Sequence, residues 1–85
     1  MKVDLHGLPF SEAKLRAQIS VGEAWADSLP KIELVHGYNL GTTIKAYIQN
    51  KNGLSEDMER IYPEIPSLIL RDKGLGSTIV RFKRP

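Results

Sequence analysis

Two short segments of alternating apolar and polar residues each end in the same dipeptide, His-Gly. The first runs over residues 2–7 and the second over residues 31–37, so the two dipeptides lie 30 residues apart. Such alternation is typical of a β-strand with one buried face, and glycine is common where a strand ends in a turn. The residues between the two segments have the spacing of a helix. A strand, a helix and a strand in this order favour parallel strands joined by a right-handed crossover.

The segment between the two strands has apolar or small residues at every third or fourth position: Leu15, Ile19, Gly22, Ala26 and Leu29. This spacing predicts an amphipathic helix of about 17 residues whose apolar seam faces the core. We expect the Ser11 hydroxyl to cap the N-terminus of this helix by accepting from free backbone N–H groups. We expect Pro30 to end the helix, since proline lacks the N–H that a helix interior requires.

The rest of the chain predicts a second helix that ends at Asn52-Gly53, a short helix within residues 54–66, and strands over residues 67–71 and 77–83. The order is β-α-β-α-(short helix)-β-β. We therefore predict an α/β (α+β) fold, a two-layer β-α-β-α-β-β sandwich. Its small mixed sheet has parallel first two strands and a C-terminal β-hairpin. A chain of 85 residues buries one modest core, so it forms a single domain.

The composition excludes several classes of protein. The chain has no cysteine, which rules out a disulfide scaffold, a thiolate zinc site, an iron–sulfur cluster and a cysteine nucleophile. No apolar run approaches the roughly 20 residues that span a bilayer, and the N-terminus does not have the pattern of a signal peptide. We therefore expect a cytoplasmic protein without a membrane partner.

The basic residues gather near the C-terminus. Residues 71–85 contain five basic residues and one acidic residue, whereas residues 1–70 contain seven basic and nine acidic residues. A basic end of this kind can bind a polyanion, most commonly the phosphate backbone of a nucleic acid. The alternative is a terminal strand whose charged side chains are simply solvated.

Asp4 and His6 are two residues apart on the first predicted strand, so their side chains project from the same face. A carboxylate beside an imidazole fixes its tautomer and raises its basicity, which suits general acid–base catalysis. The alternative is that Asp4 caps a neighbouring turn and His6 is a structural edge residue. A metal site formed by Asp4, His6 and His36 is a third interpretation, although their spacing matches no recognised metal-binding pattern.

The two His-Gly dipeptides are also expected to meet in space. Ligands of open α/β sheets bind beyond the carboxyl ends of the strands. If the two parallel strands are neighbours, about 4.8 Å apart, His6 and His36 lie at the same edge. The helices that follow present free N–H groups to anions there, and Gly7 and Gly37 let a ligand approach the backbone.

Three motifs in the same order resemble the Smr (small MutS-related) domain. Residues 3–8, with Ser-Glu-Ala at residues 11–13, resemble its Asp-Leu-His-Gly opening and the start of the following helix. Residues 34–37 are similar to its second motif, His-Gly-x-Gly, and residues 76–80 are similar to its closing Gly-x-Thr-x-Val strand. The similarity spans nearly the whole chain, so residues 1–85 are expected to form one Smr-like domain.

The resemblance implies a domain that binds nucleic acid, with DNA nicking or RNA cleavage in some members. Asp4 and His6 would then form the catalytic pair, with His36 nearby as a second proton-transfer or phosphate-contacting group. The phosphate backbone would be held by Gly7, Gly37, Asn39, Lys45, Arg71, Lys73 and Arg81. Asn39 departs from the family pattern because a second glycine is usual there, and Lys45 is displaced by one position.

Three functions follow from these observations. The first is an endonuclease, with RNA as the expected substrate. RNA can supply its own 2′-hydroxyl as nucleophile, so no cofactor is required, although a divalent metal is compatible. The second is a nucleic-acid-binding module without catalysis. The third is a protein-interaction domain whose basic end meets an acidic partner.

Overall fold

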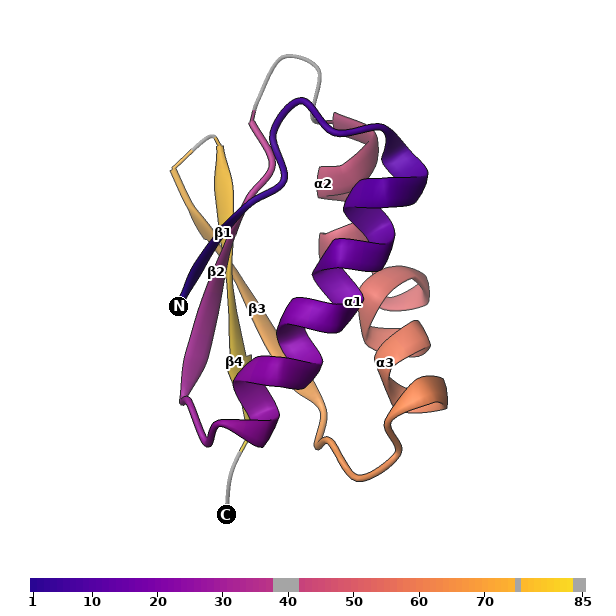
Figure 1. Cartoon of the computed structure of the whole chain (residues 1–85), viewed down its shortest axis with the longest axis vertical. Coiled ribbons are helices and arrows are strands. Elements are labelled where there is room, and N and C mark those ends of the chain that lie inside the picture. Colours follow the sequence, from indigo (N-terminus) through magenta and orange to yellow (C-terminus); the bar gives the residue numbers. More distant parts are fainter. Residues whose placement is uncertain (38–41, 75, 84–85) are drawn as a thin grey trace.

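The structure, a computed structural model, describes residues 1–37, 42–74 and 76–83. It has two layers, a four-stranded sheet and a layer of helices that covers one face of that sheet (Figure 1). The strands are β1 (Lys2–Asp4), β2 (Lys31–Val35), β3 (Leu68–Lys73) and β4 (Ser77–Phe82). The helices are α1 (Phe10–Ala26), α2 (Thr42–Gln49), the π-helical turn η1 (Lys51–Ser55) and α3 (Glu56–Ile61). None of the described helices is long and apolar enough to cross a membrane.

The order of strands in the sheet is β1-β2-β4-β3. β1 is parallel to β2, with Val3 opposite Leu34, and both neighbours of β4 are antiparallel to it. β3 and β4 form the C-terminal hairpin. The predicted fold class, with its parallel first two strands, is therefore confirmed.

The core lies between the sheet and the helices. Alternate residues of the central strands point into it, so Ile32 and Leu34 of β2 lie beside Val80 of β4, and all three are fully buried. From the helical layer, Ile44, Ile48, Leu54 and Met58 complete the same cluster. The other face of the sheet has no described helix over it, because all helices pack on one side (Figure 1).

The predicted orientation of α1 is wrong. Leu15 and Ile19, expected in the core, are 56% and 47% exposed. The buried face of α1 is instead formed by Ala13, Ala17, Ser20, Val21 and Ala24. These smaller side chains let the helix approach a sheet whose own residues are large, so the core is filled mainly from the sheet and from α2 and α3. Gly22 contacts the ring of Tyr62, whose nearest carbon is 3.3 Å from the position of a Cβ there.

Both predicted ends of α1 also differ. The helix begins at Phe10 after Pro9 and has no side-chain cap, so Ser11 lies inside its first turn. It ends at Ala26, before Pro30, and the chain reverses at Ser28 with a positive φ of 59°. In the second helix, the end lies at Gln49 rather than at Asn52-Gly53.

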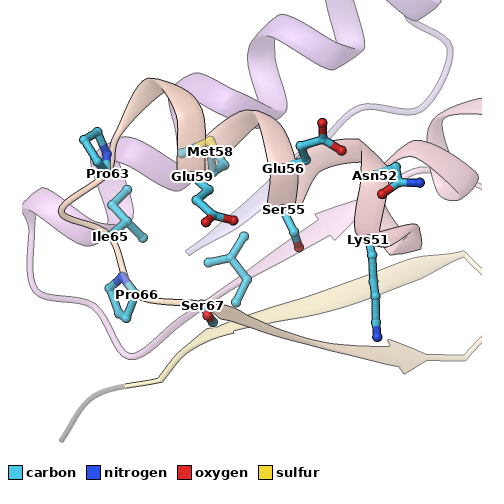
Figure 2. Close-up of a pocket in the computed structure, with 11 residues that line it drawn as sticks. Lys51, Asn52, Ser55, Glu56, Met58, Glu59, Pro63, Ile65, Pro66 and Ser67 are labelled. Atoms are coloured by element: carbon cyan, nitrogen blue, oxygen red, sulfur yellow. The ribbon is translucent and has the colours of Figure 1, made fainter.

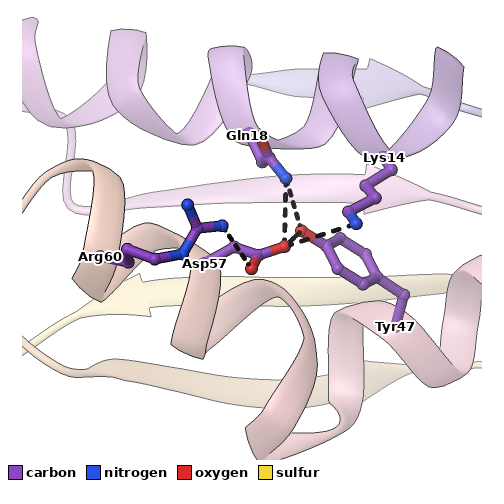
Figure 3. Close-up of polar contacts among 5 residues, drawn as sticks. All are labelled: Lys14, Gln18, Tyr47, Asp57 and Arg60. Carbon is purple, nitrogen blue, oxygen red and sulfur yellow. Dashed lines mark hydrogen bonds and ion pairs between the residues drawn. The ribbon is translucent and has the colours of Figure 1, made fainter. Parts of the chain in front are cut away.

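A polar cluster ties the three helices together (Figure 3). The Tyr47 hydroxyl of α2 donates to Asp57 Oδ2 of α3 at 2.7 Å, and the Gln18 amide of α1 donates to the Tyr47 oxygen at 2.8 Å. Arg60 Nη2 lies 3.0 Å from Asp57 Oδ1. The hydrogen bond from Tyr47, followed by that from Arg60, lowers the pKa of Asp57. The layer that covers the sheet is therefore held together by one carboxylate.

Candidate functional site

Three segments meet at one end of the sheet. β1 and β2 end side by side, as predicted, and the backbone N–H of Leu5 donates to the Val35 carbonyl at 2.7 Å. The hairpin between β3 and β4 reaches the same end, where the Gly76 carbonyl accepts from the N–H groups of His36 at 2.9 Å and Gly37 at 3.0 Å. We call this end, formed by residues 5–8, 36–37 and 76–77, the rim.

His6 is the exposed imidazole of the rim, and it lies against Gly37. A Cβ on Gly37 would come within 2.9 Å of His6 Cδ2, a distance that real Cβ atoms do not show. Gly37 also has a φ of +76°, which favours glycine by itself. At Gly7 the φ is +80°, but the position of its Cβ faces open space. Gly37 is therefore favoured by its conformation, and a side chain there would displace the His6 ring from its present position.

The Asp4 side chain forms a hydrogen bond with the backbone of His6. Its Oδ1 atom accepts from the His6 backbone N–H at 2.9 Å, which fixes the turn that follows β1. This is the arrangement expected for a carboxylate that caps a turn. Asp4 therefore holds the backbone from which the imidazole projects, and the imidazole itself packs on Gly37.

The predicted role of His36 as a proton-transfer or phosphate-contacting group does not fit the structure, because the residue is only 1% exposed. In β2 the alternation that buries Ile32 and Leu34 continues to His36 and turns its ring toward the helices. Its Nδ1 donates to the Gly37 carbonyl at 2.8 Å, and its Nε2 lies 3.0 Å from Thr78 Oγ1. His36 thus connects β2 to β4 inside the domain, while His6 faces solvent.

The face of the sheet opposite the helices is basic. Directly paired residues of neighbouring strands project from the same face. Lys31 is paired with Arg81, and Arg81 with Ile69; on the next row, Glu33 is paired with Ile79, and Ile79 with Arg71. By this register the face carries five exposed basic residues, which are Lys2, Lys31, Arg71, Lys73 and Arg81. We call it the open sheet face.

Two of these residues, Lys2 and Lys31, were not among the predicted site residues. The alternation of apolar and polar residues in β1 and β2 already placed them opposite the core, so that signal was available in the sequence. The charge count along the chain indicates only the C-terminal basic residues. The register of the sheet shows that basic residues from both ends of the chain share one face.

One of the predicted phosphate-binding lysines is already paired. Lys73 Nζ donates to Glu33 Oε1 at 3.0 Å, and this hydrogen bond is the main cause of the lowered pKa of Glu33. Arg71 and Arg81 form no salt bridge with any described residue. The two arginines are therefore more available to a ligand than Lys73.

The remaining predicted residues lie elsewhere. Lys45 is half-buried on α2, in the helical layer, so it does not share the open sheet face with the other basic residues. Asn39 lies outside the described residues. Among residues that are described, no group of three histidine, aspartate or glutamate side chains is placed to hold a metal ion.

A separate cavity of about 630 Å³ lies between α3 and the start of β3 (Figure 2). Met58, Ile65 and Leu68 line it together with the carboxylates of Glu56 and Glu59. It contains none of the predicted site residues, so the rim and the open sheet face form the candidate site.

No model of a known protein family matches the chain, and no curated protein matches it. A solved structure that it resembles is the crystal structure of the Smr domain of Thermus thermophilus MutS2. The two chains superpose with a TM-score of 0.63 and are 26% identical, and the match covers 98% of each. The similarity therefore includes the rim, the helical layer and all four strands.

Proposed function

The chain is an Smr-like domain, and from this premise we propose that it binds nucleic acid across the open sheet face and cleaves RNA at the rim. The observation that carries the proposal is the gathering of five exposed basic residues on one face, against the two acidic residues Asp4 and Glu33. Such a face attracts the phosphate backbone and releases its counterions on binding.

The side chains between the basic residues favour binding without base preference. Val35, Ile69 and Ile79 occupy the middle of the open sheet face, and Phe82, the aromatic residue of β4, points the other way into the core. Sheets that read bases in single-stranded RNA do so with aromatic side chains on which bases stack. The strands of this domain present no aromatic residue on that face, so contacts to phosphate and sugar dominate.

The proposed cleavage step uses His6. An exposed imidazole beside a phosphate can take the proton from the RNA 2′-hydroxyl as a general base. The 2′-oxygen then forms a bond to phosphorus while the bond from phosphorus to the 5′-oxygen breaks, and water protonates the leaving oxygen. The products are a 2′,3′-cyclic phosphate and a 5′-hydroxyl. Asp4 supports this step by fixing the turn that carries His6.

The test uses labelled single-stranded RNA, single-stranded DNA and duplex DNA at low salt. Fluorescence anisotropy measures binding, and a denaturing gel measures cleavage. We expect all three to bind and only RNA to yield fragments with cyclic phosphate ends. His6→Ala should abolish the fragments while binding persists, because the basic residues remain. If no nucleic acid binds, the proposal is rejected and a protein partner for the basic face is favoured; if His6→Ala cuts as fast as wild type, only the cleavage step is rejected.

A further inference from the structure

β3 is an edge strand whose outer side is free. The strand order places it at one end of the sheet, beside β4. The Lys83 backbone N–H donates to the Ser67 carbonyl, and hydrogen-bonded pairs alternate along an antiparallel ladder. Leu68, Leu70 and Asp72 therefore direct their backbone N–H and C=O groups away from β4. None of these groups bonds to another described segment, so the outer side of β3 can accept a further strand.

The helical layer does not fully cover β3. Leu68 is paired with Phe82 and Leu70 with Val80, so all four side chains point toward the helices. Phe82 and Val80 are buried, whereas Leu68 and Leu70 are only partly buried. The cavity of about 630 Å³ occupies the space between Leu68 and α3 (Figure 2). A strand added to β3 would direct every second side chain toward this cavity.

The cavity combines an apolar floor with carboxylates. Met58 and Ile65, both buried, form the floor together with Leu68. Glu56 and Glu59 line the cavity from α3, and both are exposed. Neither carboxylate forms a salt bridge with a described residue, so both are available to a basic ligand group.

Lys51 is the one cation among the described residues that line the cavity. It lies at the other end of the cavity from Glu59 (Figure 2), and it forms no salt bridge with a described residue. The positive and negative groups of the cavity are therefore separated along β3. A basic side chain fits near Glu59, beside the start of the strand.

From these features we infer that β3 captures an extended peptide segment of a protein partner, which adds to the sheet antiparallel to β3 and places a lysine or arginine in the cavity. Domains that bind peptides by strand addition obtain affinity from the free edge and specificity from pockets for alternate side chains. The aliphatic stem of the basic residue would lie on Met58 and Ile65. Its charged end would meet Glu56 and Glu59.

The other face of β3 favours a partner of different sequence over a second copy. Arg71 lies on the open sheet face. Two β3 strands related by a twofold axis have two longest registers with matched faces, and these place the two Arg71 side chains directly opposite or diagonal to each other. Like charges so placed are destabilising. A peptide can instead place a carboxylate beside Arg71, so we expect its basic and acidic residues to point to opposite faces.

The test uses the whole domain, without nucleic acid, and a fluorescein-labelled peptide Thr-Glu-Leu-Val-Lys with blocked ends. Antiparallel pairing places its lysine opposite Leu68 and its glutamate opposite Arg71. Anisotropy should show saturable binding. N-methylation of the peptide leucine should abolish binding, because its N–H faces β3, whereas N-methylation of the valine is the matched control and should not. Hydrogen exchange measured by NMR should slow at the Leu68 and Leu70 amides and stay unchanged in β1, the opposite edge strand.

A charge exchange tests the cavity. Glu59→Lys should weaken peptide binding by more than about tenfold, because it places like charges together. Glu64→Lys is the matched control, since Glu64 is also exposed but does not line the cavity. A peptide with glutamate in place of its lysine should bind Glu59→Lys more tightly than it binds the wild type. NMR spectra confirm that each variant is folded.

A peptide that shows no saturable binding would overturn the inference. So would equal losses for the two N-methylated peptides, or equal effects of the two lysine variants. Protection of the Leu68 and Leu70 amides that grows with protein concentration, without peptide, would assign this edge to a second copy and would also overturn it. None of these outcomes involves nucleic acid, so the proposed function is tested separately.

Discussion

The imidazole of His6 rests on the backbone of Gly37, where a Cβ would come within 2.9 Å of its Cδ2 atom. This contact brings the side chain that follows β1 against the backbone that follows β2. Gly37, which follows the second histidine, thus provides the surface on which the ring of the first histidine lies. The two His-Gly dipeptides form one structural unit even though only one histidine faces solvent.

Gly37→Ala should therefore displace His6. The substitution also meets a left-handed backbone conformation, which costs an alanine roughly 1–2 kcal/mol. Gly7→Ala is the matched control, because Gly7 has the same kind of φ but open space at its Cβ position. Urea unfolding should show a larger loss of stability for Gly37→Ala, and NMR should show shifted His6 ring resonances in that variant alone. Equal effects of both variants would show that the His6 contact contributes nothing.

The parallel pairing of the first two strands was predictable because it depends on local patterns in the sequence. Alternation identifies each strand, and the helix between them requires the parallel crossover. The orientation of α1 was not predictable in the same way, since its sequence carries two apolar faces. Leu15 and Ile19 are the larger residues, yet the smaller face packs on the sheet because the sheet supplies the large side chains. Which face of α1 packs on the sheet therefore depends on the volumes of the side chains that distant segments place in the core.

For the site, the sequence predicts that the two parallel strands end side by side, and the register confirms this. The two histidines differ in exposure because His36 continues the inward alternation of Ile32 and Leu34, whereas the His-Gly motif alone treats both histidines alike. Of the two interpretations of Asp4, the turn cap fits the structure, because Asp4 Oδ1 accepts from the backbone N–H of His6. A short strand followed by a tight turn allows both arrangements, so only the turn geometry decides between them.

Thr78→Val should destabilise the domain through His36. The Thr78 hydroxyl lies 3.0 Å from His36 Nε2 and accepts from Gln49 Nε2 at 2.9 Å, inside the core. Valine has the same shape but leaves a buried ring nitrogen without a partner, which costs roughly 1–3 kcal/mol. Thr43→Val, at an exposed position of α2, should change the free energy of unfolding very little. Equal stability of the two variants would contradict a structural role for His36.

The polar cluster of the helices should make stability depend on acid pH. The pKa of Asp57 is lowered mainly by the hydrogen bond from Tyr47. Ionised Asp57 therefore adds its full contribution to the free energy of unfolding above its pKa in the unfolded chain. That contribution is lost as the pH falls through the pKa of Asp57 in the folded protein. Tyr47→Phe should cost about 1 kcal/mol near neutral pH, and this difference from wild type should shrink as the pH falls. Tyr62→Phe, measured in the same pH series of urea unfolding, should show no such trend. A pH-independent cost for Tyr47→Phe would contradict the assignment.

Glu33→Gln should strengthen nucleic-acid binding. In the wild type Glu33 pairs with Lys73 and neutralises one cation of the open sheet face. Its removal frees Lys73 for a phosphate, which should raise the affinity and steepen the salt dependence by about one unit. Glu64→Gln makes the same change in net charge at an exposed position outside the sheet and should have a smaller effect. Anisotropy titrations measure the affinity of each variant. Equal increases in affinity for both variants would indicate that only the net charge of the domain matters.

The salt dependence of RNA affinity measures whether the open sheet face binds the phosphate backbone. We expect the logarithm of the affinity to fall linearly with the logarithm of salt concentration, and Lys31→Ala with Arg81→Ala to reduce the slope by about two. The matched pair Lys51→Ala with Arg60→Ala removes the same two residue types from the helical layer and should leave the slope nearly unchanged. A slope equally reduced by both pairs, or an affinity independent of salt, would contradict binding across the open sheet face.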